Sequence, residues 1–170
     1  IADLGTGSGC LLCALLSEFP NAQGVGVDRS EAALAVARTN AAALGVGERA
    51  AFVGGDWLAP LTGAFDLIVA NPPYIAEAEA PDLSRDVAAY EPHGALFAGA
   101  DGFDAYGAII RQLPPFVAEG GLVLMECGST QTETLTAMLR DLASEKAIFT
   151  LYDLAGRPRG AGCDLGKGGK

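Results

Sequence analysis

The residues of this sequence best suited to chemistry are Asn71, Pro72, Pro73 and Tyr74, which follow the short apolar run 65–70. Each proline fixes its own φ angle, removes a backbone donor and holds the residue before it in an extended conformation. The carbonyl groups of this corner (residues 71–74) therefore remain free as acceptors, and the Asn71 side chain adds another. A rigid pair of acceptors beside an aromatic ring suits the binding of a planar NH2 group. The simpler interpretation is a loop that only ends a strand, since Pro-Pro corners are common.

A glycine loop (residues 5–9) near the start of the chain is the second candidate region. Gly5, Gly7 and Gly9 surround Thr6, and this spacing differs from the dinucleotide fingerprint G-x-G-x-x-G, whose third glycine would fall at Cys10. The loop also lacks the Lys-Ser/Thr pair of a P-loop, so binding of a pyrophosphate is disfavoured. Its backbone can still approach a ligand closely, because glycine has no side chain to intrude.

Three acidic residues and a tryptophan complete the set of candidates. Asp3 precedes the glycine loop and could accept a hydrogen bond from a ligand ammonium group, or cap the turn. Asp28 follows a second apolar run and could bind both hydroxyl groups of a ribose, or cap a helix. Asp56 offers a carboxylate to an exocyclic amine, and Trp57 offers an aromatic wall to a purine, unless it only packs in the core.

A nucleoside without phosphates, beside a site for an NH2 group, indicates S-adenosylmethionine as cofactor and methyl transfer to nitrogen. An amide nitrogen is a poor nucleophile because its lone pair is delocalised into the carbonyl group. The Asn71 side chain and the Pro72 carbonyl could bind its two hydrogens and aim the lone pair at the sulfonium methyl, with Tyr74 packed on the planar group. Catalysis would then depend mainly on orientation and electrostatics.

Alternating strands and helices must position these residues. Strands are expected over residues 1–4, 24–28, 50–53, 65–70, 121–127 and 146–152, and helices over 10–19, 31–44, 103–117 and from a capping box at Thr130 and Glu133 to about Leu142. This alternation predicts a parallel sheet with helices on both faces, and ligands bind such sheets at the carboxyl ends of the strands, where all the candidates lie. A closing strand is expected in the tail, yet 160–166 is poor strand material. Residues 75–101 lack periodicity and are a candidate lid.

Composition limits the class of protein. The 170 residues suffice for one domain, and 11 basic against 21 acidic residues give a net charge of −10, which disfavours direct binding of nucleic acid. No apolar run approaches the ~20 residues of a membrane helix. Cys10 and Cys13 form a C-x-x-C without a second such pair, and His93 is far away in sequence. We interpret them as two small core residues of a reduced, cytoplasmic protein and predict no metal site.

Together these stretches resemble the HemK/PrmC family of protein-(glutamine-N5) methyltransferases. The matching residues are 3–9, Asp56-Trp57, 71–75, Tyr90-Glu91-Pro92, Ala95-Leu96, Asp101-Gly102, Glu126-x-Gly128-x-x-Gln131 and 153–157. The motif of residues 71–74 is shared with DNA-adenine and rRNA-guanine N-methyltransferases. The Glu91-Pro92 stretch and the Leu-Ala-Gly-Arg stretch are what narrow the resemblance to this family.

The resemblance implies a Rossmann-like class I fold, which is a mostly parallel seven-stranded sheet flanked by helices, with a reversed last strand. It implies S-adenosylmethionine as cofactor and a peptide chain release factor as partner, whose Gly-Gly-Gln glutamine is methylated while Asn71 and Pro72 bind its amide. Residues 1–170 would then form the catalytic domain, and a helical domain would precede Ile1. The tail 160–170 departs from the apolar last strand of the family.

Two other functions remain open from the sequence. A nucleic-acid N-methyltransferase could use the same corner on a flipped base, but it would need a basic face. A non-catalytic domain that binds S-adenosylmethionine is the second alternative, and the intact Asn71, Asp28 and glycine loop argue against it.

Overall fold

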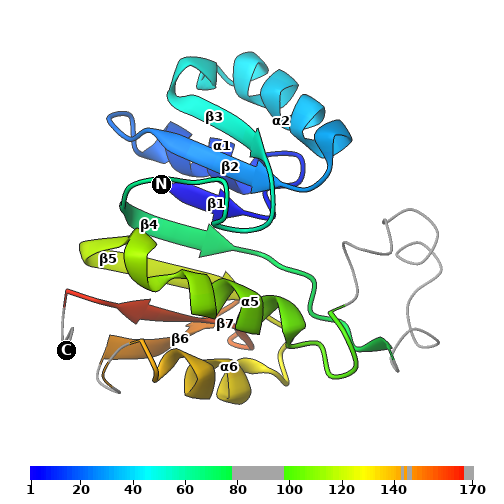
Figure 1. Cartoon of the computed structure of the whole chain (residues 1–170), viewed down its shortest axis with the longest axis vertical. Helices are drawn as coiled ribbons and strands as arrows, with labels where there is room; N and C mark the ends of the chain where they lie inside the picture. Colours follow the sequence, from blue (N-terminus) through cyan, green and yellow to red (C-terminus); the bar gives the residue numbers. More distant parts are fainter. Residues whose placement is uncertain (78–97, 143, 145–146, 167–170) are drawn as a thin grey trace.

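A computed structural model of the chain describes residues 1–77, 98–142, 144 and 147–166. Its strands are β1 (Ala2–Leu4), β2 (Gly24–Asp28), β3 (Ala50–Gly54), β4 (Phe65–Ala70), β5 (Val117–Glu126), β6 (Ile148–Tyr152) and β7 (Pro158–Asp164). They form one seven-stranded sheet in the order β3-β2-β1-β4-β5-β7-β6 (Figure 1). Strand β7 is antiparallel to β5 and β6, and the other pairs are parallel. The expected seven-stranded sheet with a reversed last strand is confirmed.

Helices cover both faces of this sheet, and a hydrophobic core lies under each layer. The helices are α1 (Cys10–Glu18), α2 (Glu31–Ala43), α5 (Asp104–Gln112) and α6 (Thr132–Leu139), with short 3-10 turns η1 (Gly47–Arg49) and η3 (Pro114–Phe116). In Figure 1, α5 and α6 lie in front of the sheet and α1 lies behind it. The larger core joins α5 and α6 to β1, β4, β5 and β7, while the smaller one joins α1 to α2 and holds Leu12, Leu16 and Ala41.

The helix ends show which local signals decide the structure. The Ser30 side chain accepts a hydrogen bond from the N–H of Ala33 at 3.2 Å, so the predicted cap of α2 is confirmed. Helix α5 ends before Pro114, as the prolines require. The capping box predicted at Thr130 and Glu133 is wrong, because Gln131 is the N-cap residue of α6 and no side chain caps that helix.

Strand β7 shows that the tail does form the closing strand, although residues 160–166 were expected to be poor strand material. Residues 158–164 pair with a neighbour on each side despite their low β propensity. A Cβ atom on Gly160 would lie 2.5 Å from the Met125 carbonyl oxygen, and one on Gly162 would lie 2.7 Å from the Phe149 ring. The glycines therefore permit a close approach that larger residues would block, and the pairing on both sides outweighs the propensity.

Other expectations fall outside the described residues. The candidate lid lies mostly there, and so do His93 and the family matches at residues 90–92 and 95–96. In the part of the chain that the structure describes, no helix has the length and apolar character needed to span a membrane.

Candidate active site

The glycine loop connects the carboxyl end of β1 to the start of α1 and is hydrogen-bonded to β2. The N–H groups of Gly5 and Thr6 both donate to the carbonyl of Val27, each at 2.9 Å. Gly9 has a φ of 74° at the N-cap of α1, where a Cβ atom would lie 2.9 Å from that of Ala37 in α2. Glycine is therefore required at Gly9 both by the left-handed backbone and by the close approach of α2. The loop is held tightly against two neighbouring elements.

Asp3 lies beneath this loop. The residue is 2% exposed, and its side chain accepts a hydrogen bond from the Thr6 hydroxyl at 2.6 Å. Burial raises the pKa of the Asp3 carboxyl to about 6, and hydrogen bonds from the Thr6 side chain and the Leu12 backbone lower it only in part. One of the two roles expected for Asp3, that of holding the turn, is thus directly visible in the structure.

Asp28, at the end of β2, connects the glycine loop to the start of α2. Its Oδ2 accepts from the N–H of Gly7 at 2.8 Å, and its Oδ1 accepts from the N–H of Ser30 at 2.9 Å. A carboxylate has about four acceptor positions, so each oxygen retains one for a ligand. The side chain is partly buried. Asp28 is therefore held in a fixed orientation with spare capacity for two donors.

Trp57 brings the third strand end into the same region. A Cβ atom on Gly5 would lie 3.3 Å from the Trp57 ring and 3.9 Å from the Asn71 carbonyl oxygen, so the ends of three strands meet here. Trp57 has a φ of 53°, and it is the one non-glycine residue with positive φ among the described residues. Backbone strain of this kind concentrates at functional sites, where the surrounding structure maintains it.

Asp56 has a partner that the sequence did not indicate. Its Oδ1 accepts from Arg29 Nη2 at 2.6 Å and from Arg29 Nε at 3.1 Å, and both side chains are at least half exposed. No motif marks Arg29, because an arginine in a loop has no pattern that reveals its contact. Asp56 therefore lies at the edge of the region with part of its carboxylate occupied.

The corner itself follows directly after β4. Asn71 is exposed and Pro72 is buried, and the Tyr74 carbonyl accepts a hydrogen bond from Gln131 Nε2 at 2.8 Å. Asn71 opens into a groove of about 510 Å³ with a mainly apolar floor, which we call the Asn71 groove. Its lining residues are Leu11, Leu15, Val69, Ala70, Asn71, Leu124, Met125, Glu126, Leu151, Asp153 and Arg159.

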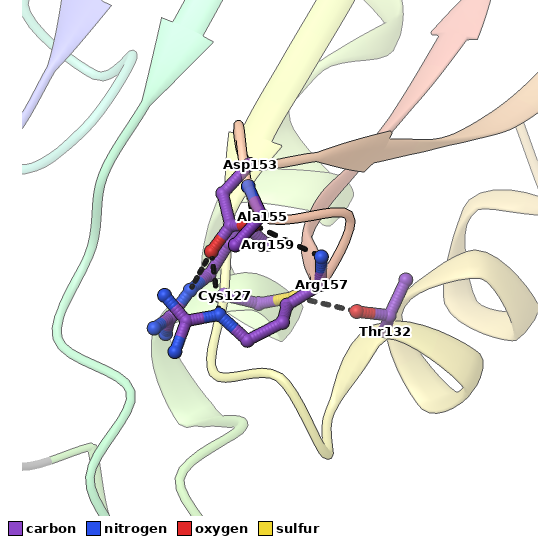
Figure 2. A network of polar contacts seen from close by, with 6 residues as sticks. All are labelled: Cys127, Thr132, Asp153, Ala155, Arg157 and Arg159. Carbon is purple, nitrogen blue, oxygen red and sulfur yellow. Dashed lines mark hydrogen bonds and ion pairs between the residues drawn. The ribbon is translucent and has the colours of Figure 1, made fainter.

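The hairpin between β6 and β7 contributes Leu151, Asp153 and Arg159 to the lining of this groove. Figure 2 shows the polar contacts of this hairpin. Asp153 accepts from the N–H groups of Ala155 and Arg157 and from Arg157 Nε, and Arg159 Nε lies 3.6 Å from its Oδ2. Hydrogen bonds from the Arg157 and Ala155 backbone and the Arg157 side chain hold the pKa of Asp153 below its ordinary value. The N–H of Cys127 donates to the Arg159 carbonyl at 2.9 Å. The Leu-Ala-Gly-Arg stretch thus forms a well-bonded turn.

The cysteines differ from the expectation in one respect. Cys13 is buried, as expected, but Cys10 is exposed, because it is the first residue of α1 and faces solvent. Both are free thiols. Within residues 1–77, 98–142, 144 and 147–166, no three His, Cys, Asp or Glu residues gather in a way that could hold a metal ion.

Comparison with known proteins identifies the family. The sequence profile described as "Methyltransferase small domain" matches residues 1–96. The chain belongs to this methyltransferase family. The fold agrees: a ribosomal protein L11 methylase from Lactobacillus delbrueckii subsp. bulgaricus superposes with a TM-score of 0.63 at 27% identity, covering 96% of this chain and 68% of that chain. TrmN from Thermus thermophilus gives 0.64 at 22% identity, covering 96% of this chain and 42% of that chain, which supports the fold alone.

Curated relatives within this methyltransferase family carry one recurring name. The release factor glutamine methyltransferase of Bradyrhizobium diazoefficiens is 49% identical over 159 residues, or 94% of this chain and 54% of the relative. That of Cereibacter sphaeroides is 45% identical over 159 residues, or 94% of this chain and 57% of the relative. The chain spans about half the length of the curated relatives it matches. The expected class I methyltransferase fold is confirmed, and the resemblance has support over most of the chain.

Proposed function

We propose that this methyltransferase domain transfers a methyl group from S-adenosylmethionine to the side-chain nitrogen of the glutamine in the Gly-Gly-Gln motif of a peptide chain release factor. The observation that carries the proposal is the meeting of Gly5, Trp57 and Asn71 at one edge of the sheet, so that a nucleoside bound by the glycine loop would lie directly beside the corner. Relatives named as release factor glutamine methyltransferases support the choice of substrate. Translation would place the reaction in the cytoplasm.

The residues around the glycine loop fit S-adenosylmethionine. Asp28 retains acceptor positions for two ribose hydroxyls, and the glycine loop lets the ligand approach the backbone. The Trp57 ring lies against Gly5 of this loop and would pack on the adenine, while Thr6 and the exposed Asp56 are further candidates for contact with it. The bound cofactor would supply an electrophilic methyl group on a cationic sulfur. The residues of the chain must bind the cofactor and the substrate amide, orient them toward each other and exclude water.

The corner fits a primary amide. The Asn71 side-chain oxygen and the Pro72 carbonyl would accept the two amide hydrogens, Tyr74 would pack on the planar group, and Pro73 would keep the corner rigid. Orientation of this kind converts a weak nucleophile into an aligned one and can supply several kcal/mol of the barrier, about 7–11 at most. Methyl transfer would break the S–CH3 bond to leave the neutral thioether, form the N–CH3 bond and release one amide proton to solvent, so the product offers the corner one donor in place of two. Product release is thereby favoured over product retention.

Labelled S-adenosylmethionine tests the proposal directly. The protein is incubated with a release factor, with the same release factor carrying Ala in place of the Gly-Gly-Gln glutamine, and separately with tRNA, rRNA and DNA. Label should enter the intact release factor and none of the others. Label in a nucleic acid would instead favour base methylation, which the net charge of −10 disfavours. Cofactor binding without transfer to any of these would indicate a binding module.

A further inference from the structure

The proposed substrate corner is held from behind by a residue on another element. Gln131 Nε2 donates to the Tyr74 carbonyl at 2.8 Å, and Gln131 Oε1 accepts from the N–H of Gly128 at 3.0 Å. The side chain is buried, with the residue 9% exposed. One amide group therefore links the loop after β5 to the corner after β4. The two partners satisfy its acceptor and one of its donor hydrogens.

The backbone of Gln131 is itself fixed. Its N–H donates to the Gly128 carbonyl at 2.9 Å, and its carbonyl accepts from the N–H of Leu135 at 3.0 Å in the first turn of α6. Helix α6 packs through the buried Leu135 and Leu139 into the larger core. Because Gln131 is fixed to a packed helix, its side chain holds the corner in a defined position.

Two glycines close the space around this side chain. Gly102 has a φ of 79°, and a Cβ atom there would collide with the Tyr74 carbonyl oxygen and lie 2.8 Å from Gln131 Nε2. A Cβ atom on Gly128 would lie 3.0 Å from Gln131 Oε1 and 3.7 Å from the Tyr74 ring. The fit leaves little room for the amide to move away from Tyr74. Both glycines belong to stretches whose role the sequence alone did not reveal.

The corner needs such support because it has few donors of its own. Pro72 and Pro73 have no N–H, so their peptide groups cannot be fixed by donating hydrogen bonds. Beyond the corner, the Ile75 carbonyl accepts from the N–H of Ala98 at 3.0 Å, which fixes the chain after Tyr74. The hydrogen bond from Gln131 therefore connects the start of α6 to the backbone of the corner.

We propose that Gln131 is a positioning residue for methyl transfer. By holding the Tyr74 carbonyl, it fixes the orientation in which the corner presents the Asn71 and Pro72 acceptors to the substrate amide. The inference rests on the proposed function. Its partners are Tyr74 and Gly128, and neither belongs to the glycine loop or to the Asp28 site, so its loss should act on turnover and leave cofactor affinity unchanged.

Two substitutions separate the hydrogen bond from the packing. Gln131→Leu removes both bonds, while Gln131→Glu keeps an acceptor for the Gly128 N–H but, when ionised, has no hydrogen for Tyr74. We expect kcat on a release factor to fall about 10- to 100-fold in both, because small misplacements of reacting groups carry losses of that order. The dissociation constant of S-adenosylmethionine should stay within about threefold of the wild-type value.

The pH dependence of Gln131→Glu gives a second readout. As pH falls, kcat of Gln131→Glu relative to wild type should recover, because a protonated carboxyl can donate to Tyr74.

Arg49→Ala is the matched control for lost stability. Arg49 donates to the carbonyls of Leu16, Phe19 and Ala22 at 2.7–3.2 Å, at the edge of the sheet opposite the corner. The Arg49→Ala substitution should lower the melting temperature and leave kcat unchanged.

A kcat within twofold of the wild-type value in both folded Gln131 variants overturns the inference. A parallel loss of cofactor affinity and kcat, or a Gln131→Glu deficit that does not depend on pH, also overturns it by indicating a general structural role. If the wild-type protein does not methylate the release factor, the proposed function fails first, and the inference fails with it.

Discussion

At the scale of single residues, Asn71 is exposed and lines the Asn71 groove. Asn71→Ala should therefore leave the fold and the cofactor dissociation constant nearly unchanged. Turnover should fall about 100-fold or more, as when one oriented polar group of an active site is removed. Single-turnover kinetics and calorimetry on the same preparation measure the two quantities. Loss of both together would place Asn71 in the structure of the corner rather than in its chemistry.

Asp28 should show the opposite pattern. Asp28→Ala removes the acceptor for Gly7 and Ser30 as well as for a ribose, so the affinity for S-adenosylmethionine should weaken by about 2–3 kcal/mol. Calorimetry measures this, and the exposed Asp66 of β4, changed to Ala, serves as the charge-matched control. An affinity equal to wild type would remove Asp28 from the cofactor site.

Asp3 gives a prediction about pH. Its folded pKa of about 6 lies above the ordinary value of 3.8, so between these values the folded state binds more protons than the unfolded state. Stability must then fall as pH rises from about 4 to about 6. Asp3→Asn, which can still accept from Thr6, should lack this loss, so its free energy of unfolding should exceed that of wild type above pH 6 by on the order of 2–3 kcal/mol.

Denaturant unfolding of both proteins at several pH values measures the difference. A gap that stays constant with pH would contradict the prediction. Cofactor binding by the same Asn variant separates the two roles expected for Asp3, since only a residue that contacts the ligand ammonium group would lower affinity.

At the scale of elements, the sequence predicted the strands where local pattern and tertiary context agree. Strands β2 and β4 have the predicted bounds, because an apolar run between clear breakers leaves one choice. Strand β5 begins at Val117, four residues earlier than expected, since pairing of Val117 with Phe65 overrides Gly120 and Gly121. Strand β7 forms for a similar reason. Propensity fails where pairing partners, which only the fold supplies, decide the conformation.

Gly162 allows this explanation of β7 to be tested. A Cβ atom there would meet the Phe149 ring at 2.7 Å and Leu124 at 2.8 Å, so Gly162→Ala should lower the free energy of unfolding by about 1–3 kcal/mol through overpacking. Gly45→Ala is the control, because its φ of 71° strains the backbone while the added Cβ would meet no atom beyond its chain neighbours within 4 Å. Its loss should be nearer to about 1 kcal/mol. Equal losses at both sites would contradict the steric explanation.

At the scale of the whole molecule, the gathering of the candidate residues could be predicted, because parallel strands end at the same edge of a sheet. The side-chain hydrogen bonds that connect different loops could not be predicted. Gln131 and Tyr74 are 57 positions apart and Arg29 and Asp56 are 27 apart, and each pair meets only after the loops pack. The Glu126-x-Gly128-x-x-Gln131 match was the one available signal, and it named Gln131 without a role.

Docking of a large protein substrate is also a property of the whole molecule. The chain spans about half the length of its curated relatives, and we propose that sequence outside residues 1–170 supplies much of the docking contact. Joining the unmatched part of the Bradyrhizobium relative to this chain, in its natural order, should lower KM for the release factor with little change in kcat. Contacts far from the reacting amide stabilise the bound ground state and the transition state equally, so their loss or gain changes KM rather than kcat. An unchanged KM would place docking within these residues.

Trp57 is the single tryptophan of the sequence, and its ring lies against Gly5 beside the Asn71 carbonyl. Light that excites indole selectively is therefore absorbed at one place in the molecule, the edge where the glycine loop meets the corner. Its emission is an intrinsic optical probe that needs no label and contains no background from other indoles. A ligand that stacks on the ring or displaces its water should change the emission intensity or wavelength, which gives a direct, real-time record of occupancy during stopped-flow mixing.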